Sequence, residues 1–116
     1  MLPNWKMFKV TVSSLRPNIH QEFFRYDSDM YDYIEEEFLQ SGKLLMMKVS
    51  VSDDRTTETC EMMFEDKQAW LDYMKDPVIK YQEPIKVRYN AYYKVAVSIN
   101  TEEITITKDL YNVYLR

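Results

Sequence analysis

The sequence predicts an α+β fold: a ferredoxin-like β-α-β-β-α-β antiparallel sheet with two helices on one face, plus a short C-terminal strand or arm. Three observations lead to this prediction, namely an alternating strand near the N-terminus, a capped amphipathic helix after it, and a hairpin whose strands match in register. The 116 residues suit one domain with one core. We therefore expect a single ferredoxin-like α+β domain over residues 1–116, with an appendix over 100–116.

The first strand is expected over residues 7–14, where successive side chains alternate between two faces. Phe8, Val10 and Val12 share one of these faces, which we assign to the core. A proline and an asparagine then break the pattern. Residues 16–26 are therefore expected to form a loop, and its apolar side chains predict that it packs onto the body.

A helix is expected after Asp27, which is a good N-cap and places negative charge where the helix dipole favours it. Met30, Ile34 and Phe38 follow at intervals of four and form an apolar stripe. Gly42 is the expected stop, because glycine readily adopts the left-handed conformation that ends helices.

The clearest feature of the sequence is a hairpin over residues 44–65 that turns at 53–56. Lys48 opposite Glu61 is an opposite-charge pair, and it supports one register, since a slip of one residue would reverse every side chain. The remaining predicted pairs are Ser52 with Thr57, Val51 with Glu58, Val49 with Cys60, Met47 with Met62, Leu45 with Phe64, Ser50 with Thr59, and Met46 with Met63.

The second half of the chain predicts one more helix and one more long strand. Asp66 is expected to cap the helix, and Pro77 is expected to end it. The apolar stripe of this helix is Ala69, Trp70, Tyr73 and Met74. Residues 86–99 alternate apolar with polar side chains, which predicts the long strand, and 103–107 predict a short fifth strand.

In this topology both helices cover one sheet face and the other face stays open. The core face would carry Phe8, Val10, Val12, Leu45, Met47, Val49, Cys60, Met62, Phe64 and the odd-numbered residues of the long strand. The open face would carry Met7, Lys9, Thr11, Met46, Lys48, Glu61, Met63, Arg88, Asn90, Tyr92 and Lys94. This face is too apolar for an ordinary solvated surface and too charged for a second core, which suits packing against a second protomer, a protein partner or a bound ligand. The apolar tail and the long last strand favour a homodimer with an exchanged C-terminus. The alternative is a mixed surface that has no role.

The run MFEDKQAWLDYMKDP, residues 63–77, has a strand that ends in an aromatic residue, then a helix of the form D-x-x-A-hydrophobic and a short stop. With the order of elements over 7–99, this run resembles the dimeric α/β-barrel group, which includes antibiotic-biosynthesis-type monooxygenases and haem-degrading enzymes. The resemblance implies a small-ligand site or cofactor-independent oxygenation. In the haem-degrading members an Asn, a Trp and a His serve the site. This chain has Trp70 but no histidine over 66–85, so we expect no haem and no other cofactor.

Composition excludes several classes of protein. The net charge of −4 and the pI near 5.0 argue against a duplex nucleic-acid binder. The single cysteine indicates a reducing compartment, and with no signal peptide or membrane-length apolar run we expect a cytoplasmic protein. One glycine beside eight methionines and ten tyrosines is a bias common in phage proteins and some low-GC bacteria.

Isolated reactive side chains give weak signals for chemistry. His20 is the one histidine and a conceivable general base, although a loop histidine with no catalytic task is the stronger interpretation. Cys60 is predicted to face the core, where burial makes a thiol a poor nucleophile. One histidine and one cysteine do not supply a zinc site. The acidic residues over 27–37 lack the pattern of a calcium loop and are expected to cap and solvate the helix.

The leading functional interpretation is a non-catalytic interaction or regulatory protein that acts through its open sheet face or acidic helix, as a homodimer. Its interaction residues would be Met46, Lys48, Glu61, Met63, Arg88, Tyr92 and Lys94. The alternative is a cofactor-independent monooxygenase-like or small-ligand-binding protein, which requires a cavity where polar groups converge. The residues to test would then be His20, Asn90, Tyr92, Trp70 and Arg88. A weaker alternative is a single-stranded nucleic-acid binder centred on Arg88, Tyr92 and Lys94.

Overall fold

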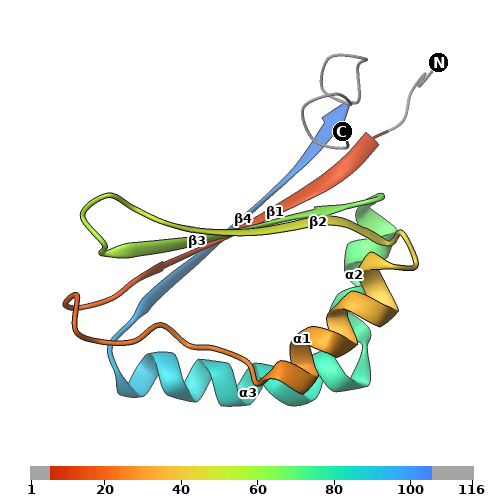
Figure 1. The fold of residues 1–116 in the computed structure, drawn as a ribbon. Helices are drawn as coiled ribbons and strands as arrows, with labels where there is room; N and C mark the ends of the chain where they lie inside the picture. The colour runs from red at the N-terminus through yellow and green to blue at the C-terminus, as the bar shows by residue number, and fades with distance from the viewer. Residues whose placement is uncertain (1–5, 106–116) are drawn as a thin grey trace.

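The computed structural model describes residues 6–105, which form an antiparallel sheet with its helices on one face (Figure 1). The elements in chain order are β1 Lys6–Leu15, α1 Ser28–Ile34, the π-helical turn η1 Glu35–Leu39, β2 Leu44–Val51, β3 Thr57–Phe64, α2 Lys67–Lys75, α3 Pro77–Tyr92 and β4 Ala96–Thr105. The strand order is β2-β3-β1-β4. This order is ferredoxin-like, so the predicted fold class is confirmed.

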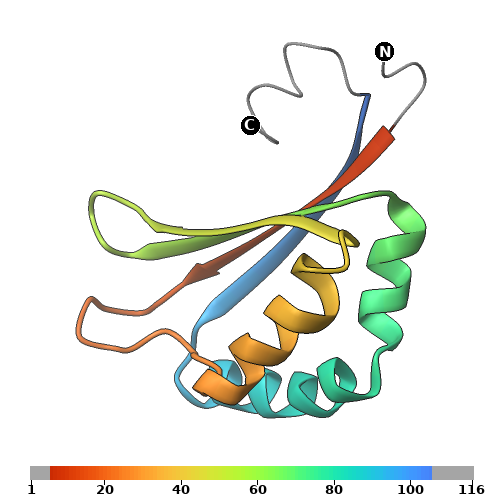
Figure 2. The same cartoon turned by 45° about the vertical axis from the view of Figure 1, so that its right-hand side comes forward.

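The helix-side face of the sheet carries the main core. Phe8 on β1 stacks on Trp70 of α2 with ring centroids 5.0 Å apart. Tyr73 lies between Phe64 of β3 and Phe38 of η1, with centroid separations of 5.3 and 4.9 Å. Aromatic pairs in these geometries add to the free energy gained from burial. The sheet, α1, η1 and α2 are therefore joined at one end of the molecule, and Figure 2 shows α1 and α2 against the same face of the sheet.

The first helix begins and ends where the sequence predicts. The Asp27 carboxylate accepts a hydrogen bond from the Met30 backbone N–H at 2.9 Å, and Met30, Ile34 and Phe38 are buried. The last turn is π-helical, since the Gln40 N–H donates to the Glu35 carbonyl at 2.9 Å. Gly42 follows with φ +82°, a conformation that glycine adopts without strain.

The hairpin register is confirmed for all predicted pairs but one. Lys48 lies opposite Glu61, and the Ser52 N–H donates to the Thr57 carbonyl at 2.9 Å. The exception is Leu45, which a bulge displaces, so that Leu44 pairs with Phe64 instead. A bulge inserts one extra residue on one strand.

The turn of the hairpin is closed by a single carboxylate. Asp54 accepts hydrogen bonds from the Ser52 and Thr56 hydroxyl groups, each at 2.7 Å. The Ser52 and then the Thr56 hydrogen bonds lower the pKa of Asp54 to about 2. Arg55 adopts a left-handed φ of +66°, which completes the reversal between β2 and β3.

The predicted strand over 86–99 is wrong, because residues up to Tyr92 belong to α3 and β4 begins at Ala96. Pro77 both ends α2 and occupies the first turn of α3, where its missing N–H costs nothing. The Asp76 carboxylate caps α3 by accepting from the Val78 and Ile79 N–H groups at 3.0 and 3.2 Å. The predicted second helix is therefore confirmed as α2, and α3 follows it where a loop and a strand were predicted.

The alternation over 86–99 wrongly predicted a strand, because the face of α3 that is turned toward the sheet is partly polar. Its buried or half-buried positions recur at helical spacing, and they are Ile79, Gln82, Glu83, Lys86, Tyr89 and Asn90. Val87, which the strand pattern placed in the core, is 56% exposed, and the neighbouring Ile85 is 39% exposed. An amphipathic helix usually turns an apolar face toward the core. In α3 most of the side chains on the inward face are polar.

The end of the chain differs from the prediction in one respect that the structure describes. Residues 103–105 continue β4 rather than starting a fifth strand. The predicted exchange of the C-terminus between protomers falls on residues 106–116, which lie outside the described residues.

Candidate functional site

A cavity of about 280 Å³ lies between the helix-side face of the sheet, α3 and the loop that follows β1. Ligand cavities in proteins usually have volumes of roughly 300–1,000 Å³, so this one suits a small molecule. Its lining residues are Val12, Ser14, Phe23, Phe24, Arg25, Tyr26, Tyr31, Met47, Val49, Glu58, Cys60, Met62, Tyr73, Lys86 and Asn90.

The cavity has two opposed apolar walls. The sheet contributes an aliphatic wall that includes Val12, Met47 and Met62. The loop and α1 contribute aromatic rings, among them Tyr26 and Tyr31, which meet edge to face with centroids 5.7 Å apart. A flat apolar body would contact a wall on each side.

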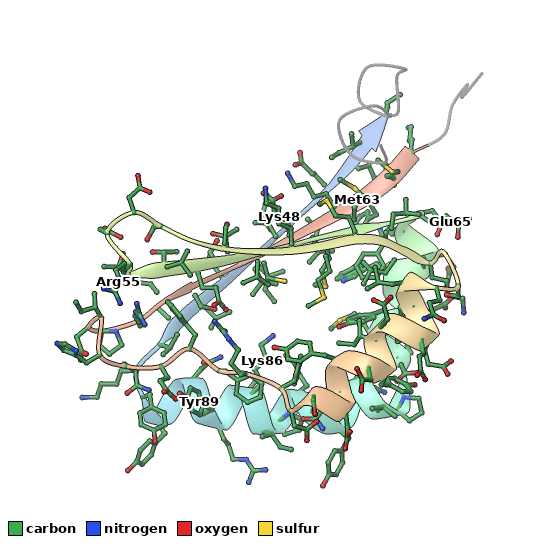
Figure 3. The ribbon with its side chains drawn as sticks, in the orientation of Figure 1. Lys48, Arg55, Met63, Glu65, Lys86 and Tyr89 are labelled. Carbon is green, nitrogen blue, oxygen red and sulfur yellow. The ribbon has the colours of Figure 1, made fainter. Side chains whose placement is uncertain are left out.

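The loop over residues 16–27 has no regular secondary structure, yet side chains fix it on both sides. The Arg16 guanidinium donates to the Arg55 carbonyl at 2.8 Å and to the Gln21 carbonyl at 2.9 Å, and it lies 4.4 Å from the centroid of Phe23. On the other side, the Tyr89 hydroxyl of α3 donates to the Glu22 carbonyl at 2.7 Å. Figure 3 shows Arg55 at the tip of the hairpin and Tyr89 on α3.

An ion pair joins the same loop to β3 at the cavity wall. Both terminal nitrogens of Arg25 donate to the Glu58 carboxylate, one of them at 2.8 Å, and this interaction raises the pKa of Arg25. The Glu58 side chain is only 13% exposed. Bidentate pairing of this kind is geometrically specific, so each of these two charges already has its partner.

Two polar groups in the cavity have no such partner. Lys86, half-buried on α3, forms no ion pair or hydrogen bond within the described part of the chain. Asn90 is 8% exposed, and no residue among 6–105 is hydrogen-bonded to its side-chain amide. These residues are four apart and so lie on one face of α3. Figure 3 shows Lys86 on the side of α3 that faces the sheet.

Cys60, Tyr26 and Tyr73 also line the cavity, and each of them has a raised pKa. Burial, opposed by the nearby Lys86 charge, raises the pKa of the Cys60 thiol. Burial, followed by the effect of Glu83, raises the pKa of Tyr26 to about 12, and burial also raises the pKa of Tyr73. At neutral pH these side chains are therefore neutral donors rather than bases or nucleophiles.

We expect the unfolding free energy to fall as pH rises from about 10 to about 12, and Tyr26→Phe to make that fall shallower. The Tyr26 phenol titrates near 10 when unfolded and about 12 when folded. Its stabilising contribution is complete below pH 10 and is lost toward pH 12, because the unfolded chain releases this proton first. Urea unfolding across this range measures the slope, and equal slopes in the variant and the wild type would contradict the burial of Tyr26.

Of the residues proposed for an enzyme, only Asn90 lines the cavity. His20 is exposed in the loop, where its backbone N–H donates to the Asn18 side-chain oxygen at 2.9 Å. Trp70 packs in the core against Phe8. Tyr92 is 79% exposed, and Arg88 is exposed on α3. The predicted constellation is therefore not assembled.

The predicted interaction face is also divided. Met46 and Lys48 on β2 and Glu61 and Met63 on β3 share the sheet face away from the helices, as expected, and Figure 3 shows Lys48 and Met63 there. Met63 is fully buried beside Met7, with Leu45, Met46 and Ile104 packed around them. The other three predicted members, Arg88, Tyr92 and Lys94, are wrong as members of this face.

Those three residues lie on or just after α3. Arg88 and Tyr92 belong to the helix, and Lys94 follows it with a left-handed φ of +58°. A strand that stacks nucleobases is therefore not formed by them, and this removes the basis of the nucleic-acid interpretation.

Residues 6–105 show neither a cluster of metal-ligating side chains nor a membrane-spanning helix. No three His, Cys, Asp or Glu side chains in this range gather as a metal site would require. None of the helices in this range has the length and apolar character that crossing a membrane demands.

Sequence reasoning missed most of the cavity wall, and Lys86 above all. Reading 77–92 with a period of 3.6 residues would have placed Ile79, Lys86 and Asn90 on one stripe with other polar residues. Lys86 and Asn90 line a cavity rather than a packed core, so this face of α3 lacks the continuous apolar stripe of a core helix. The loop aromatics carry no periodic signal, and only the fold brings them to the cavity.

Comparison with solved structures supports the fold. No protein-family model and no curated protein matches the sequence. A candidate antibiotic biosynthesis monooxygenase from Deinococcus radiodurans is similar over 85% of this chain and 94% of its own, with a TM-score of 0.50 and 8% identity. A Shewanella oneidensis protein is similar over 92% and 98%, with a TM-score of 0.50 and 11% identity. At these identities the likeness shows the fold alone, and it agrees with the ferredoxin-like fold that the sequence predicts.

Proposed function

We propose that the protein binds a small, predominantly apolar molecule in the cavity between the sheet and α3. The observation that carries this proposal is the pair of unpartnered polar groups, on Lys86 and Asn90, in a cavity whose other walls are largely apolar. Few polar groups in an apolar cavity are typical of small-molecule sites, where they orient the ligand. Among the described residues no buried side-chain nitrogen or oxygen atom lacks a hydrogen-bond partner, so these two groups remain accessible to water in the cavity. A ligand that displaces this water has to supply acceptors of its own, and one that does so is selected over one that leaves the two groups unpaired.

The chemistry of the lining residues favours binding over catalysis. Cys60, Tyr26 and Tyr73 are protonated at neutral pH because their pKa values are raised. Glu58 is held by Arg25. A general base has to be free to accept a proton from the substrate, and these groups are poorly placed to do so.

Oxygenase-like chemistry without a cofactor is the second candidate. The Deinococcus radiodurans structure with this fold supports it, through the activity that its name proposes. Oxygen consumption by the purified protein with hydroxynaphthalenes, measured at an oxygen electrode, separates the two candidates. Turnover above that of a variant with a filled cavity, Val12→Phe, would favour the oxygenase. Binding without turnover would favour the ligand-binding protein.

Filling the cavity tests the binding proposal. Val12→Phe places a phenyl ring in the cavity, since Val12 lines it from β1. We expect the purified wild type to bind indole, with NMR shift changes at Cys60 and Asn90, and the variant to bind at least about tenfold more weakly, which corresponds to about 1.4 kcal/mol.

Thr11→Phe is the matched control, because neighbouring residues of a strand point to opposite faces of the sheet. This variant adds the same ring to the face away from the helices and should leave the indole affinity within about twofold. The proposal fails if indole and related neutral aromatics cause no shift changes at the cavity, or if both variants bind equally well.

A further inference from the structure

The proposed ligand cavity carries one positive charge without a counter-charge. Among residues 6–105, the cationic side chains that line it are Arg25 and Lys86, and the carboxylate that lines it is Glu58. Because Glu58 binds both terminal nitrogens of Arg25, that pair is neutral overall. The Lys86 ammonium has no ion-pair partner among residues 6–105. The charge left over in the cavity is therefore positive.

Glu83 is the nearest acidic residue on the same helix, three positions before Lys86. It borders a different groove, together with Lys80 and Val87. It makes no ion pair with Lys86. Glu83 thus leaves the ammonium available to a ligand.

Lys86 and Asn90 together suit a carboxylate. They lie four residues apart on α3, so the ammonium and the side-chain amide are neighbours on one helix face. Each is a donor, and a carboxylate offers two acceptor oxygens. Hydrogen bonds between an ammonium and a carboxylate are also about twice as strong as those between neutral groups.

The side chains that line the cavity suit an aromatic ring beside that carboxylate. Met47 and Met62 lie on the sheet wall and Tyr26 on the opposite wall. Thioether sulfur and aromatic rings both contact aromatic faces and edges favourably. We propose that the ligand is a small aromatic carboxylate, with its ring between these walls and its carboxylate on Lys86 and Asn90. This inference rests on the proposed function.

Three probes of nearly the same shape test it: 3-phenylpropanoate, 3-phenylpropanamide and 3-phenylpropylamine, which are anionic, neutral and cationic at pH 7. NMR titration of the full chain measures the dissociation constant of each. We expect the carboxylate to bind about tenfold tighter than the amide, and the amine to bind weakest, because a partly buried ammonium attracts an anion and repels a cation.

Variants assign the preference to one side chain. Lys86→Met should reduce the ratio of the amide to the carboxylate dissociation constants to about one, with the amide affinity itself within about twofold of wild type. Lys86→Arg keeps the charge and should retain a preference. Lys80→Met is the matched control, since it removes the same charge from an exposed position of α3 outside the cavity, and it should leave the ratio unchanged.

The outcomes separate the two proposals. If none of the probes binds and indole does not bind either, the proposed function itself fails. If the amide or the amine binds the wild type as tightly as the carboxylate, the ligand site stands and the carboxylate inference fails. The inference also fails if the preference survives in Lys86→Met, because another group, such as Arg25, would then recognise the anion.

Discussion

Phe64→Ala should lower the unfolding free energy by about 3–5 kcal/mol, which is the usual cost of removing a buried phenyl ring. Phe64 is fully buried at the end of β3, and its ring meets Tyr73 of α2 edge to face at 5.3 Å. The substitution removes both the buried area and this aromatic contact. Domains have total stabilities of about 5–15 kcal/mol, so the loss is a large share of the whole. Urea unfolding followed by circular dichroism measures it.

Two further variants keep the result interpretable. Phe64→Leu retains most of the buried volume and should cost less than about 2 kcal/mol, so a measurement exists even if the alanine variant does not fold. Val51→Ala on the same hairpin is the matched control, because Val51 is 47% exposed and should change stability by less than about 0.5 kcal/mol. If Phe64→Ala and Val51→Ala lowered the unfolding free energy equally, the result would contradict the burial of Phe64 in the core at the end of β3.

The parts of the fold that the sequence predicted are those where local chemistry and packing agree. Asp27 caps α1 and Gly42 ends the helical segment, and both residue types have few alternatives in these roles. The hairpin register followed from Lys48 opposite Glu61 and from the alternation around it, because a period of two leaves one alignment with one buried face.

The prediction failed in the second half of the chain, where the alternating sequence pattern and the observed packing disagree. In α3 the apolar residues at odd positions, such as Ile85 and Val87, are exposed, while Lys86 and Asn90 face the sheet. Lys86 and Asn90 line a cavity rather than a packed core, so the apolar-inside pattern that sequence reasoning assumes does not hold for this face of α3. The misplaced helix and the missed site thus have the same physical cause.

The loop over 16–27 lay beyond prediction for a different reason. Its contribution to the cavity depends on contacts with distant residues, namely Arg16 with the Arg55 carbonyl and Arg25 with Glu58. The spacing of apolar residues in the sequence does not predict contacts of this kind. The predicted packing of the loop onto the body holds for Phe23, which is buried, but the sequence does not show that the loop encloses a space.

Asp76→Ala should lower the unfolding free energy by about 2–4 kcal/mol, because one carboxylate serves two structural roles at the junction of α2 and α3. It caps α3 through the Val78 and Ile79 N–H groups, and losing such a cap costs about 0.5–2 kcal/mol. It also accepts the Tyr33 hydroxyl of α1 at 2.8 and 2.9 Å. A hydrogen bond to a charged group contributes about 1.5–3 kcal/mol.

The matched control is Asp66→Ala, which removes the cap of α2, a hydrogen bond to the Ala69 N–H at 2.8 Å. Within the described part of the chain no side-chain hydroxyl donates to Asp66 as Tyr33 does to Asp76, so the loss of Asp66 should cost only about 1 kcal/mol. Asp76→Asn keeps an acceptor for the cap and should recover much of the stability. The Tyr33 pKa, raised to about 12 mainly by its hydrogen bond to Asp76, should fall in Asp76→Ala and stay unchanged in Asp66→Ala.

The same pair of variants connects stability with the cavity. α3 presents Lys86 and Asn90 to the cavity, and Asp76 fixes the end at which this helix begins. Asp76→Ala should therefore weaken binding of indole and 3-phenylpropanoate, whereas Asp66→Ala should leave both affinities within about twofold. Equal binding by the two variants would show that the position of α3 does not depend on its cap. The cavity would then be maintained by the loop contacts of Tyr89 and Arg25 instead.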